Sequence, residues 1–191
     1  MKALEVHLAP ARGVNETAAM TPAIREVTDQ DAAAIAAIYA HHVLHGTASY
    51  DTEPLTVADT LAKIRRITQA SWPFLVAEID GEVAGYCYAT QMRDRAGYRY
   101  TAEDSIYVQP ERMGCGIGKA LLAELLRRSA AGGFRTMIAV VGGAEPASIA
   151  LHASLGFETV GRLNGVGFKF GRWLDTVYMQ RDLDLSRMVE N

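Results

Sequence analysis

Three glycines between a strand pattern and a helix pattern are the feature that most limits what this chain can form. Residues 101–126 read TAEDSIYVQPERMGCGIGKALLAELL, and the glycines are Gly114, Gly116 and Gly118. The helix expected over about residues 115–131 has an apolar face made of Ile117, Leu121 and Leu125. Backbone N–H groups at a helix start form an anion site, and glycines leave room for a ligand beside the backbone. The segment therefore predicts a strand, a turn that holds a phosphate group, and a helix.

Two common phosphate-binding patterns do not fit this turn. A Walker P-loop requires glycine five residues before the Gly-Lys pair and Ser or Thr after it, but Met113 and Ala120 stand there. A dinucleotide fingerprint requires G-x-G-x-x-G after the first strand of its unit, whereas the spacing here is G-x-G-x-G after about the fourth strand. A tight turn without a ligand is the remaining alternative, and the three glycines favour a bound phosphate over it.

The rest of the pattern predicts a single α+β domain with a mixed sheet. T-x-x-D capping patterns at Thr28 and Thr56 open two helices, and the first buries Ile35, Ile38 and Tyr39. Residues 74–90 form two apolar runs joined by Asp-Gly, which predicts a β-hairpin with a type I′ turn. The further elements expected are strands at 23–27, 105–108, 136–141 and 173–183, and a short helix within 146–157. We expect the domain to span residues 21–185, between a flexible extension at 1–20 and a tail at 186–191.

Composition excludes several classes of protein. The chain has 191 residues, of which 49% are hydrophobic and 21% charged, and such a chain can bury a core without metal or disulfides. Its sequence pI near 5.9 and the lack of a dense Lys/Arg run argue against nucleic-acid binding. Cys87 and Cys115 are far apart and match no metal spacing, and residues 1–20 resemble neither a signal peptide nor a membrane span. We therefore expect a cytoplasmic protein with no metal, and we interpret His41, His42 and His45 as helix-end residues.

These motifs resemble the GNAT (Gcn5-related) N-acetyltransferases. The turn is similar to that family's R/Q-x-x-G-x-G/A motif, and four segments are similar to phosphinothricin N-acetyltransferases in particular: FLVAEIDGEVAGYCYA, YTAEDSIYV, SIALHASLGF and GFKFGRW. The likeness covers about residues 22–183. It implies the GNAT fold, a mixed and mostly antiparallel sheet flanked by helices. It also implies acetyl-CoA as co-substrate, a small-molecule amine as acceptor, and a homodimer.

The resemblance also implies which residues hold the cofactor. The acetyl and pantetheine part would meet the backbone of Tyr107, Val108 and Gln109. The phosphates would lie on the segment Cys115, Gly116, Ile117, Gly118, Lys119 and Ala120. Ser148 falls where a later helix helps to hold CoA, and Glu145 stands where the family usually has an asparagine, whose hydrogen bond a carboxylate cannot donate. Met113 replaces the usual Arg or Gln, but backbone amides should bind most of the anion.

Acyl transfer to an amine requires a neutral amine, a polarised carbonyl and a proton for the leaving thiolate. The resemblance places Glu103 on the family's catalytic glutamate and His152 on a histidine implicated with it. Glu103 can take the ammonium proton, and the N–H of Val108 can bind the oxyanion. By residue type alone Glu103 would be a solvated strand-end carboxylate like Asp104, and His152 a buried core histidine.

The acceptor pocket is predicted from the segment QMRDRAGYRY, which interrupts the strand rhythm. By resemblance, the residues that grip the anionic groups of an amino acid are Tyr50, Arg93, Arg95, Tyr98 and Gly142. The alternative for this segment is a solvated basic loop. We expect acetylation of an amino acid related to phosphinothricin or methionine sulfoximine, by direct attack within a ternary complex. The alternatives are another amine, such as a peptide N-terminus or a polyamine, and a CoA-binding module without turnover.

Overall fold

The computed structural model describes residues 22–183, which form one α+β unit. The strands are β1 (Ala23–Glu26), β2 (Phe74–Ile79), β3 (Glu82–Gln91), β4 (Thr101–Val108), β5 (Thr136–Gly142), β6 (Glu158–Lys169) and β7 (Arg172–Asp182). The helices are α1 (Ala32–His45), α2 (Val57–Gln69), α3 (Ile117–Ala131) and α4 (Pro146–Ala153), with short 3₁₀ turns at Asp29–Asp31, Ala96–Tyr98 and Pro110–Arg112. The predicted extension and tail lie outside the described residues.

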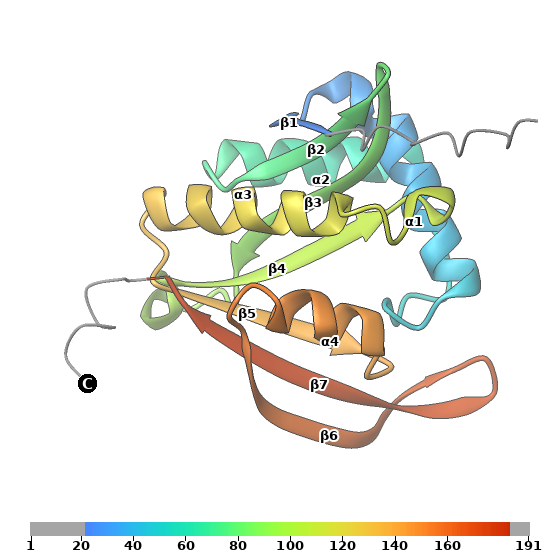
Figure 1. Cartoon of the computed structure of the whole chain (residues 1–191), viewed down its shortest axis with the longest axis vertical. Coiled ribbons are helices and arrows are strands. Elements are labelled where there is room, and N and C mark those ends of the chain that lie inside the picture. Colours follow the sequence, from blue (N-terminus) through green and yellow to red (C-terminus); the bar gives the residue numbers. More distant parts are fainter. Residues whose placement is uncertain (1–21, 184–191) are drawn as a thin grey trace, which may run out of the picture.

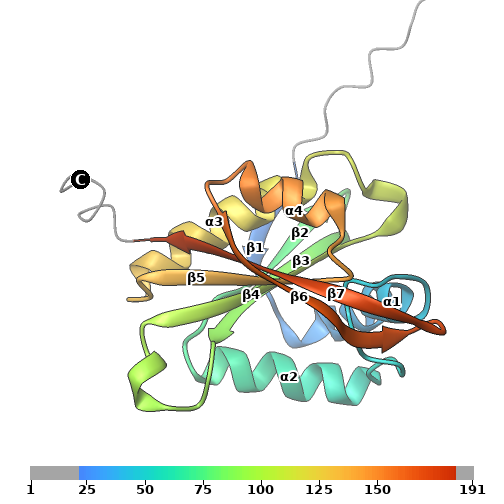
Figure 2. The same cartoon turned by 90° about the horizontal axis from the view of Figure 1, so that it is seen from below.

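The seven described strands form one sheet in the order β1-β2-β3-β4-β5-β7-β6. Neighbouring strands in this order pair antiparallel, except β4 and β5, which are parallel. Helices α1 and α2 cover one face of the sheet and α3 and α4 the other, as Figures 1 and 2 show. Each face has its own apolar core, one around Leu121 and Leu125 of α3 and one around Ile35 of α1 and Ile67 of α2. The predicted fold class is confirmed.

Local signals account for the first half of the fold. The hairpin turn between β2 and β3 has positive φ at both Asp80 (53°) and Gly81 (80°), as a type I′ turn requires. The capping box at the start of α2 is present, since the Thr56 hydroxyl accepts from the Asp59 N–H at 3.1 Å and donates to its carboxylate at 2.6 Å. Both predictions are confirmed. The described helices include none long and apolar enough to cross a membrane.

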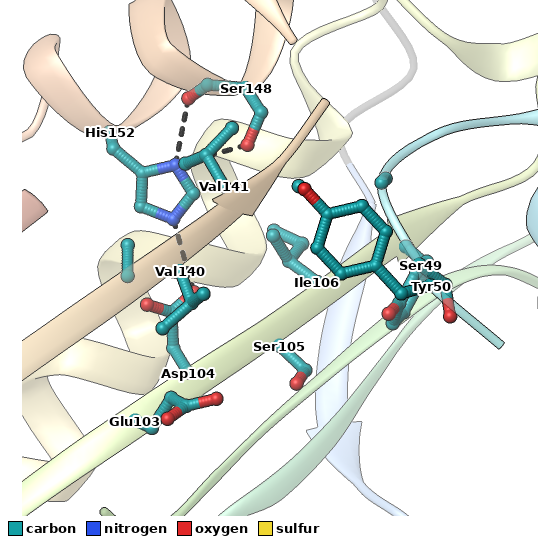
Figure 3. Close-up of a pocket in the computed structure, with 14 residues that line it drawn as sticks. Ser49, Tyr50, Glu103, Asp104, Ser105, Ile106, Val140, Val141, Ser148 and His152 are labelled. Atoms are coloured by element: carbon teal, nitrogen blue, oxygen red, sulfur yellow. Dashed lines mark hydrogen bonds and ion pairs between the residues drawn. The ribbon is translucent and has the colours of Figure 1, made fainter. Parts of the chain in front are cut away.

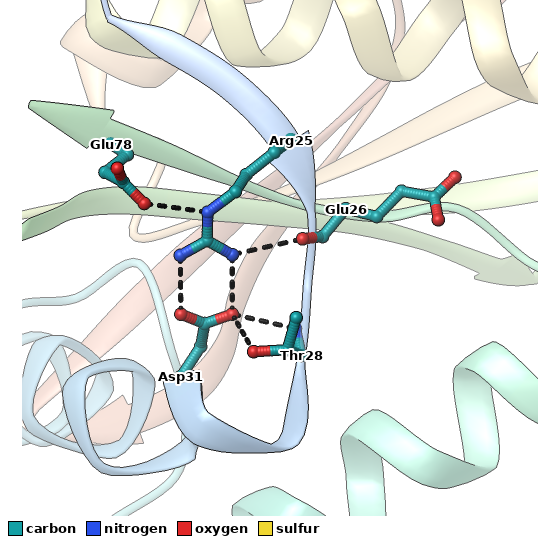
Figure 4. Close-up of polar contacts among 5 residues, drawn as sticks. All are labelled: Arg25, Glu26, Thr28, Asp31 and Glu78. Atoms are coloured by element: carbon teal, nitrogen blue, oxygen red, sulfur yellow. Dashed lines mark hydrogen bonds and ion pairs between the residues drawn. The ribbon is translucent and has the colours of Figure 1, made fainter. Parts of the chain in front are cut away.

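The capping pattern at Thr28 opens a 3₁₀ turn before α1, and its aspartate also binds an arginine (Figure 4). Asp31 is buried and accepts two hydrogen bonds from the Arg25 guanidinium, both at 2.8 Å, and one from the Thr28 N–H at 2.7 Å. Arg25 also donates to Glu78 on β2 at 2.8 Å. This bidentate pair holds the pKa of Asp31 below its usual value and ties β1 to α1 and β2.

Strand β6 is absent from the sequence prediction, which leaves residues 158–172 without an element. It contains three glycines, its side chains are mostly exposed, and its pairing with β7 shifts register twice. Such a segment lacks the regular alternation that signals a strand. The largest boundary differences are at the starts of two elements, because β4 begins at Thr101 and α3 begins at Ile117; β1, β5 and β7 differ from the prediction by one residue at one or both ends.

Candidate active site

The site begins where two central strands separate. The parallel ladder between β4 and β5 runs from the pair Thr101–Thr136 to the pair Asp104–Ala139. Beyond it the two strands no longer pair with each other, although β4 stays paired with β3 and β5 with β7. Along an antiparallel ladder, the backbone N–H groups of successive residues point alternately toward and away from the partner strand. The Gln109 N–H donates to the carbonyl of Ala84, so the N–H of Tyr107 also points toward β3. The N–H groups of Ile106 and Val108 therefore point the other way, toward β5. The split therefore offers backbone donors to a ligand.

Two adjoining cavities, of about 220 Å³ and 680 Å³, lie at this split. Of the described residues, Ala48, Ile106, Tyr107 and Ser148 line both. A ligand in the larger cavity can therefore present a group to the smaller one at this junction.

The larger cavity ends at the glycine turn. Gly114 and Gly116 both have left-handed backbone, with φ of 78° and 81°, which is the region that favours glycine. The first bond of α3 runs from the Ala120 N–H to Gly116, and no described side chain caps the helix. The N–H groups that precede Ala120 thus remain available at the positive end of the helix dipole.

Positive charge and tight packing complete this turn. Lys119 and Arg112 line the same cavity. A Cβ at Gly118 would lie 3.2 Å from the side chain of Leu151 on α4, so a larger residue there would press the two helices apart. The arrangement can bind an anion of the size of a pyrophosphate, which is the feature that the sequence predicts for this turn.

The residues predicted to bind the cofactor divide into two groups. Those that line the larger cavity are Tyr107, Val108, Gly116, Gly118, Lys119, Glu145 and Ser148. Those that do not are Gln109, Cys115, Ile117 and Ala120. The side chain of Ile117 is buried in the core, and Gln109 uses its N–H and its carbonyl for bonds to Ala84 and Arg112.

Three histidines lie at the end of α1, as the sequence interpretation has them, and they also line the larger cavity: His41, His42 and His45. His42 donates from Nε2 to the carbonyl of Val108 at 2.8 Å. Burial lowers its pKa, although that hydrogen bond partly offsets the effect, so the ring is neutral near pH 7. The sequence signal that could have found this role is their common position at the end of one helix, before a loop.

Besides Tyr107 and Ser148, the smaller cavity brings together the predicted catalytic residues Glu103 and His152 and two of the predicted acceptor residues, Tyr50 and Gly142. Figure 3 shows Glu103, His152 and Tyr50 around it. Burial raises the pKa of the Glu103 carboxyl; the charge of Arg93 partly offsets this and that of Asp104 adds to it. A carboxyl group with such a pKa suits proton abstraction near neutral pH.

The expectation that Asp104 is solvated is wrong. Its side chain is 2% exposed, and its Oδ2 lies 3.1 Å from Nε2 of His152. The physical reason is strand alternation, because Glu103 and Asp104 point to opposite faces of β4 and Asp104 faces the side covered by α4. His152 is buried as well, with Nδ1 2.7 Å from the carbonyl of Ser148.

The early loop between α1 and α2 forms the outer wall of both cavities. Tyr50 bonds through its hydroxyl to Thr176 Oγ1 at 2.6 Å and to the carbonyl of Asp175 at 3.0 Å, and it accepts from the Gly143 N–H at 3.2 Å. Its ring lies over Gly167 of β6, where a Cβ would be 2.5 Å from Cε1. The hairpin of β6 and β7 thus positions this wall.

Lys169 is a site-shaping residue that the sequence prediction missed. Its side chain is 4% exposed, and Nζ donates to the carbonyls of Gly46 at 3.0 Å and Ser49 at 2.7 Å. Burial lowers its pKa, and the charge of Asp51 partly offsets this. Lys169 therefore holds the loop between α1 and α2 against β6, although the two segments are far apart in the sequence.

The remaining predicted acceptor residues lie outside both cavities. Arg93, Arg95 and Tyr98 are exposed in the loop between β3 and β4 and line neither cavity. Arg93 is near enough to act electrostatically on Glu103. The described residues include no cluster of three or more His, Cys, Asp or Glu that could hold a metal ion.

A split sheet whose larger cavity ends at an uncapped helix start, beside a smaller cavity that holds a carboxyl group, suits an acyl-CoA-dependent transferase. The family model described as acetyltransferase (GNAT) domain matches residues 24–178. The phosphinothricin N-acetyltransferase of Alcaligenes faecalis is 48% identical over 92% of this chain and 90% of its own length. The L-methionine sulfoximine/L-methionine sulfone acetyltransferase of Salmonella typhimurium is 40% identical over 84% of this chain and 94% of its own.

A solved structure agrees with these sequence relatives. The phosphinothricin acetyltransferase of Sinorhizobium meliloti, in complex with acetyl-CoA, superposes with a TM-score of 0.84 at 49% identity, over 85% of this chain and 89% of that one. The chain belongs to the GNAT acetyltransferase family, which confirms the resemblance seen in its sequence. Within that family it is similar to the phosphinothricin and methionine sulfoximine acetyltransferases.

Proposed function

We propose that this protein transfers the acetyl group of acetyl-CoA to the amine of a small amino acid of the phosphinothricin or methionine sulfoximine type. The observation that carries the proposal is the junction of the two cavities, one ending in an anion-binding helix start and the other holding a carboxyl group. The relatives that share this fold carry the corresponding activities in their names.

Acetyl-CoA fits the larger cavity in chemical terms. Its pyrophosphate would lie on the N–H groups at the start of α3, near Lys119, and the pantetheine arm would follow the split edge of β4. The thioester would then reach the junction, where the N–H of Val108 can stabilise the developing oxyanion. Both cysteines are free thiols, which suits a reducing compartment such as the cytoplasm.

Glu103 would act as the base in this reaction. It takes a proton from the ammonium group of the acceptor, directly or through water, and the neutral amine then attacks the thioester within a ternary complex. Arg93 and Arg95 would hold the acceptor's anionic groups if the exposed loop closes on the bound amino acid, since guanidinium groups bind carboxylates bidentately.

The proposal is tested by thiol release from acetyl-CoA with a panel of amino acids, their amides and the matching alkylamines. We expect turnover with phosphinothricin or methionine sulfoximine, and much lower kcat/KM when the carboxylate is missing. Glu103→Gln should lower turnover by roughly 10²–10⁴-fold near neutral pH. Equal activity on amines without a carboxylate would refute the acceptor class, and CoA binding without thiol release from any amine would identify a binding module.

We also infer that the protein is a homodimer. One edge of the sheet, formed by β6, the following turn and the start of β7, exposes large apolar side chains, namely Val160, Leu163, Val166, Phe168, Phe170 and Trp173. Large apolar side chains left exposed along an edge strand are typical of a protein–protein interface. Sedimentation velocity at micromolar concentration should give a dimer that Trp173→Glu weakens, and a wild-type monomer would refute the inference.

A further inference from the structure

The imidazole of His152 lies between two hydrogen-bond acceptors. Nδ1 is 2.7 Å from the carbonyl oxygen of Ser148, and Nε2 is 3.1 Å from Oδ2 of Asp104 (Figure 3). The ring packs edge-on against Phe157, with ring centroids 5.0 Å apart. The side chains of His152 and Asp104 are both buried. The geometry is therefore fixed by an apolar surround.

This arrangement requires one proton more than a neutral histidine and an ionised aspartate provide. A carbonyl oxygen can only accept, so Nδ1 must donate to Ser148. If His152 were neutral, the lone pair on Nε2 would face a carboxylate oxygen, and two buried acceptors would repel each other. Either His152 is an imidazolium ion or Asp104 is protonated, and both forms hold the same additional proton.

The surroundings favour keeping that proton. Burial by itself lowers the pKa of His152, but the hydrogen bond and charge of Asp104, with the Ser148 carbonyl, raise it above the usual value. Cys87 on β3 faces Asp104 as a neutral thiol, because burial raises its pKa, and Glu103 is on the opposite face of β4. The charged groups farther out are Glu124 and Arg128 of α3, which pair with each other, and Arg181 of β7, which donates to Leu155.

Ser148 connects this pair to the place of reaction. It lines both cavities, and its hydroxyl oxygen is 3.4 Å from Nδ1 of His152. Of the other junction residues described, Tyr107 also carries a hydroxyl, but that hydroxyl interacts with Tyr39, on the face of the sheet covered by α1 and α2. The serine hydroxyl need not be acidic itself, because it takes a proton from His152 as it gives its own away.

We propose that the Asp104–His152 pair stores one proton and delivers it, through the Ser148 hydroxyl, to the thiolate that leaves acetyl-CoA. Asp104 is then a positioning residue, since it acts through His152. The inference rests on the proposed transferase function and adds the acid that complements the base Glu103.

The step balances as follows. The amine nitrogen forms its bond to the acetyl carbon, and the C–S bond breaks with its electron pair going to sulfur. The sulfur takes the proton of the Ser148 hydroxyl while that oxygen takes the Nδ1 proton of His152. His152 is left neutral, with Nε2–H donating to the Asp104 carboxylate. A proton from solvent restores the pair through the smaller cavity.

The stored proton can be tested without any turnover. Side-chain ¹⁵N–¹H correlation spectra of the histidines should show both nitrogens of His152 protonated at pH 7, or a neutral His152 beside an Asp104 whose carboxyl carbon has the shift of the acid form. Asp104→Asn should leave His152 with one proton. A neutral His152 beside an ionised Asp104 in the wild type would overturn the proposal.

Kinetics then tests the delivery. Ser148→Ala should lower kcat roughly 10²-fold while leaving both His152 protons in place, whereas Ser154→Ala, which removes an exposed hydroxyl of the same helix region, should change neither. In Asp104→Asn the fall of kcat on the alkaline side of its pH profile should move to lower pH, because the imidazole of His152 loses the carboxylate that raises its pKa. A fall that does not move, together with a lowered melting temperature, would make the pair structural and overturn the relay.

The failure of the proposed function looks different. A wild-type protein that releases no thiol with any amine refutes the transferase and, with it, the relay. A wild type that turns over and a Ser148→Ala variant with unchanged kcat refute the relay alone.

Discussion

Gly167 of β6 offers a sharp test of how the acceptor cavity is built. In Gly167→Ala the new methyl group would lie 2.5 Å from Cε1 and 2.7 Å from Cζ of Tyr50, which is far inside contact distance. The ring can withdraw only by giving up its hydroxyl contacts to Thr176, Asp175 and Gly143. Forced packing of this kind costs about 1–3 kcal/mol. For a chain of this length that corresponds to a fall in Tm of about 2–12 °C.

The variant should also raise the KM for the acceptor, because Tyr50 lines the smaller cavity, and should leave the CoA-induced rise in Tm intact. Gly161→Ala is the matched control: it lies on the same strand, has nothing within 4 Å of its added methyl group, and makes the same change in the entropy of the unfolded chain. Differential scanning fluorimetry and steady-state kinetics measure both effects. If the two variants behave alike, Tyr50 is not held by this strand and the reasoning is refuted.

Three further outcomes are expected. Gly116→Val should abolish the Tm rise caused by CoA, whereas Gly81→Val, with equal backbone strain in the β2–β3 turn, should keep it; a retained response in the first variant would misplace the phosphate site. Lys169→Met leaves two loop carbonyls without their donor and should lower the unfolding free energy by about 1–3 kcal/mol in denaturant titration, and an unchanged value would mean that the loop holds itself. On the pH profile of kcat/KM, the fall on the acid side should come at a higher pH than the usual pKa of a glutamate, because burial raises the pKa of Glu103 and only its ionised form can act as the base. A kcat/KM that does not change with pH in that region would exclude Glu103 as the base.

Features governed by neighbouring residues could be predicted from the sequence. The Asp80–Gly81 turn, the Thr56 capping box and the glycine turn before α3 each depend on a few adjacent residues and their backbone preferences, and all three are found. Strand β6 could not be predicted in this way. Its glycines weaken the strand signal, and one of them, Gly167, is there because the ring of a residue from the early loop lies on it.

Only part of the candidate site could be predicted, because some of its contacts join residues that are far apart in the sequence. Alternation along β4 implies that Glu103 and Asp104 face opposite ways, but sequence spacing does not reveal that a histidine from α4 meets the second of them. The resemblance identified Glu103 and His152 separately. The partner Asp104, which decides how His152 can act, required coordinates.

The separation of the two cavities has a consequence for substrate choice. The phosphate turn depends on α3 and its packing against α4, whereas the wall of the acceptor cavity is the early loop, which Lys169 and the contacts of Tyr50 fasten to β6 and β7. Changes in the β6–β7 hairpin can therefore move the acceptor wall without disturbing the helix start at which we propose that the anion binds. Because β6 is also an edge strand of the sheet, a second copy bound there would contact the strand that positions this wall. Acceptor preference should then respond to substitutions at that edge, far from Glu103, while affinity for CoA stays constant.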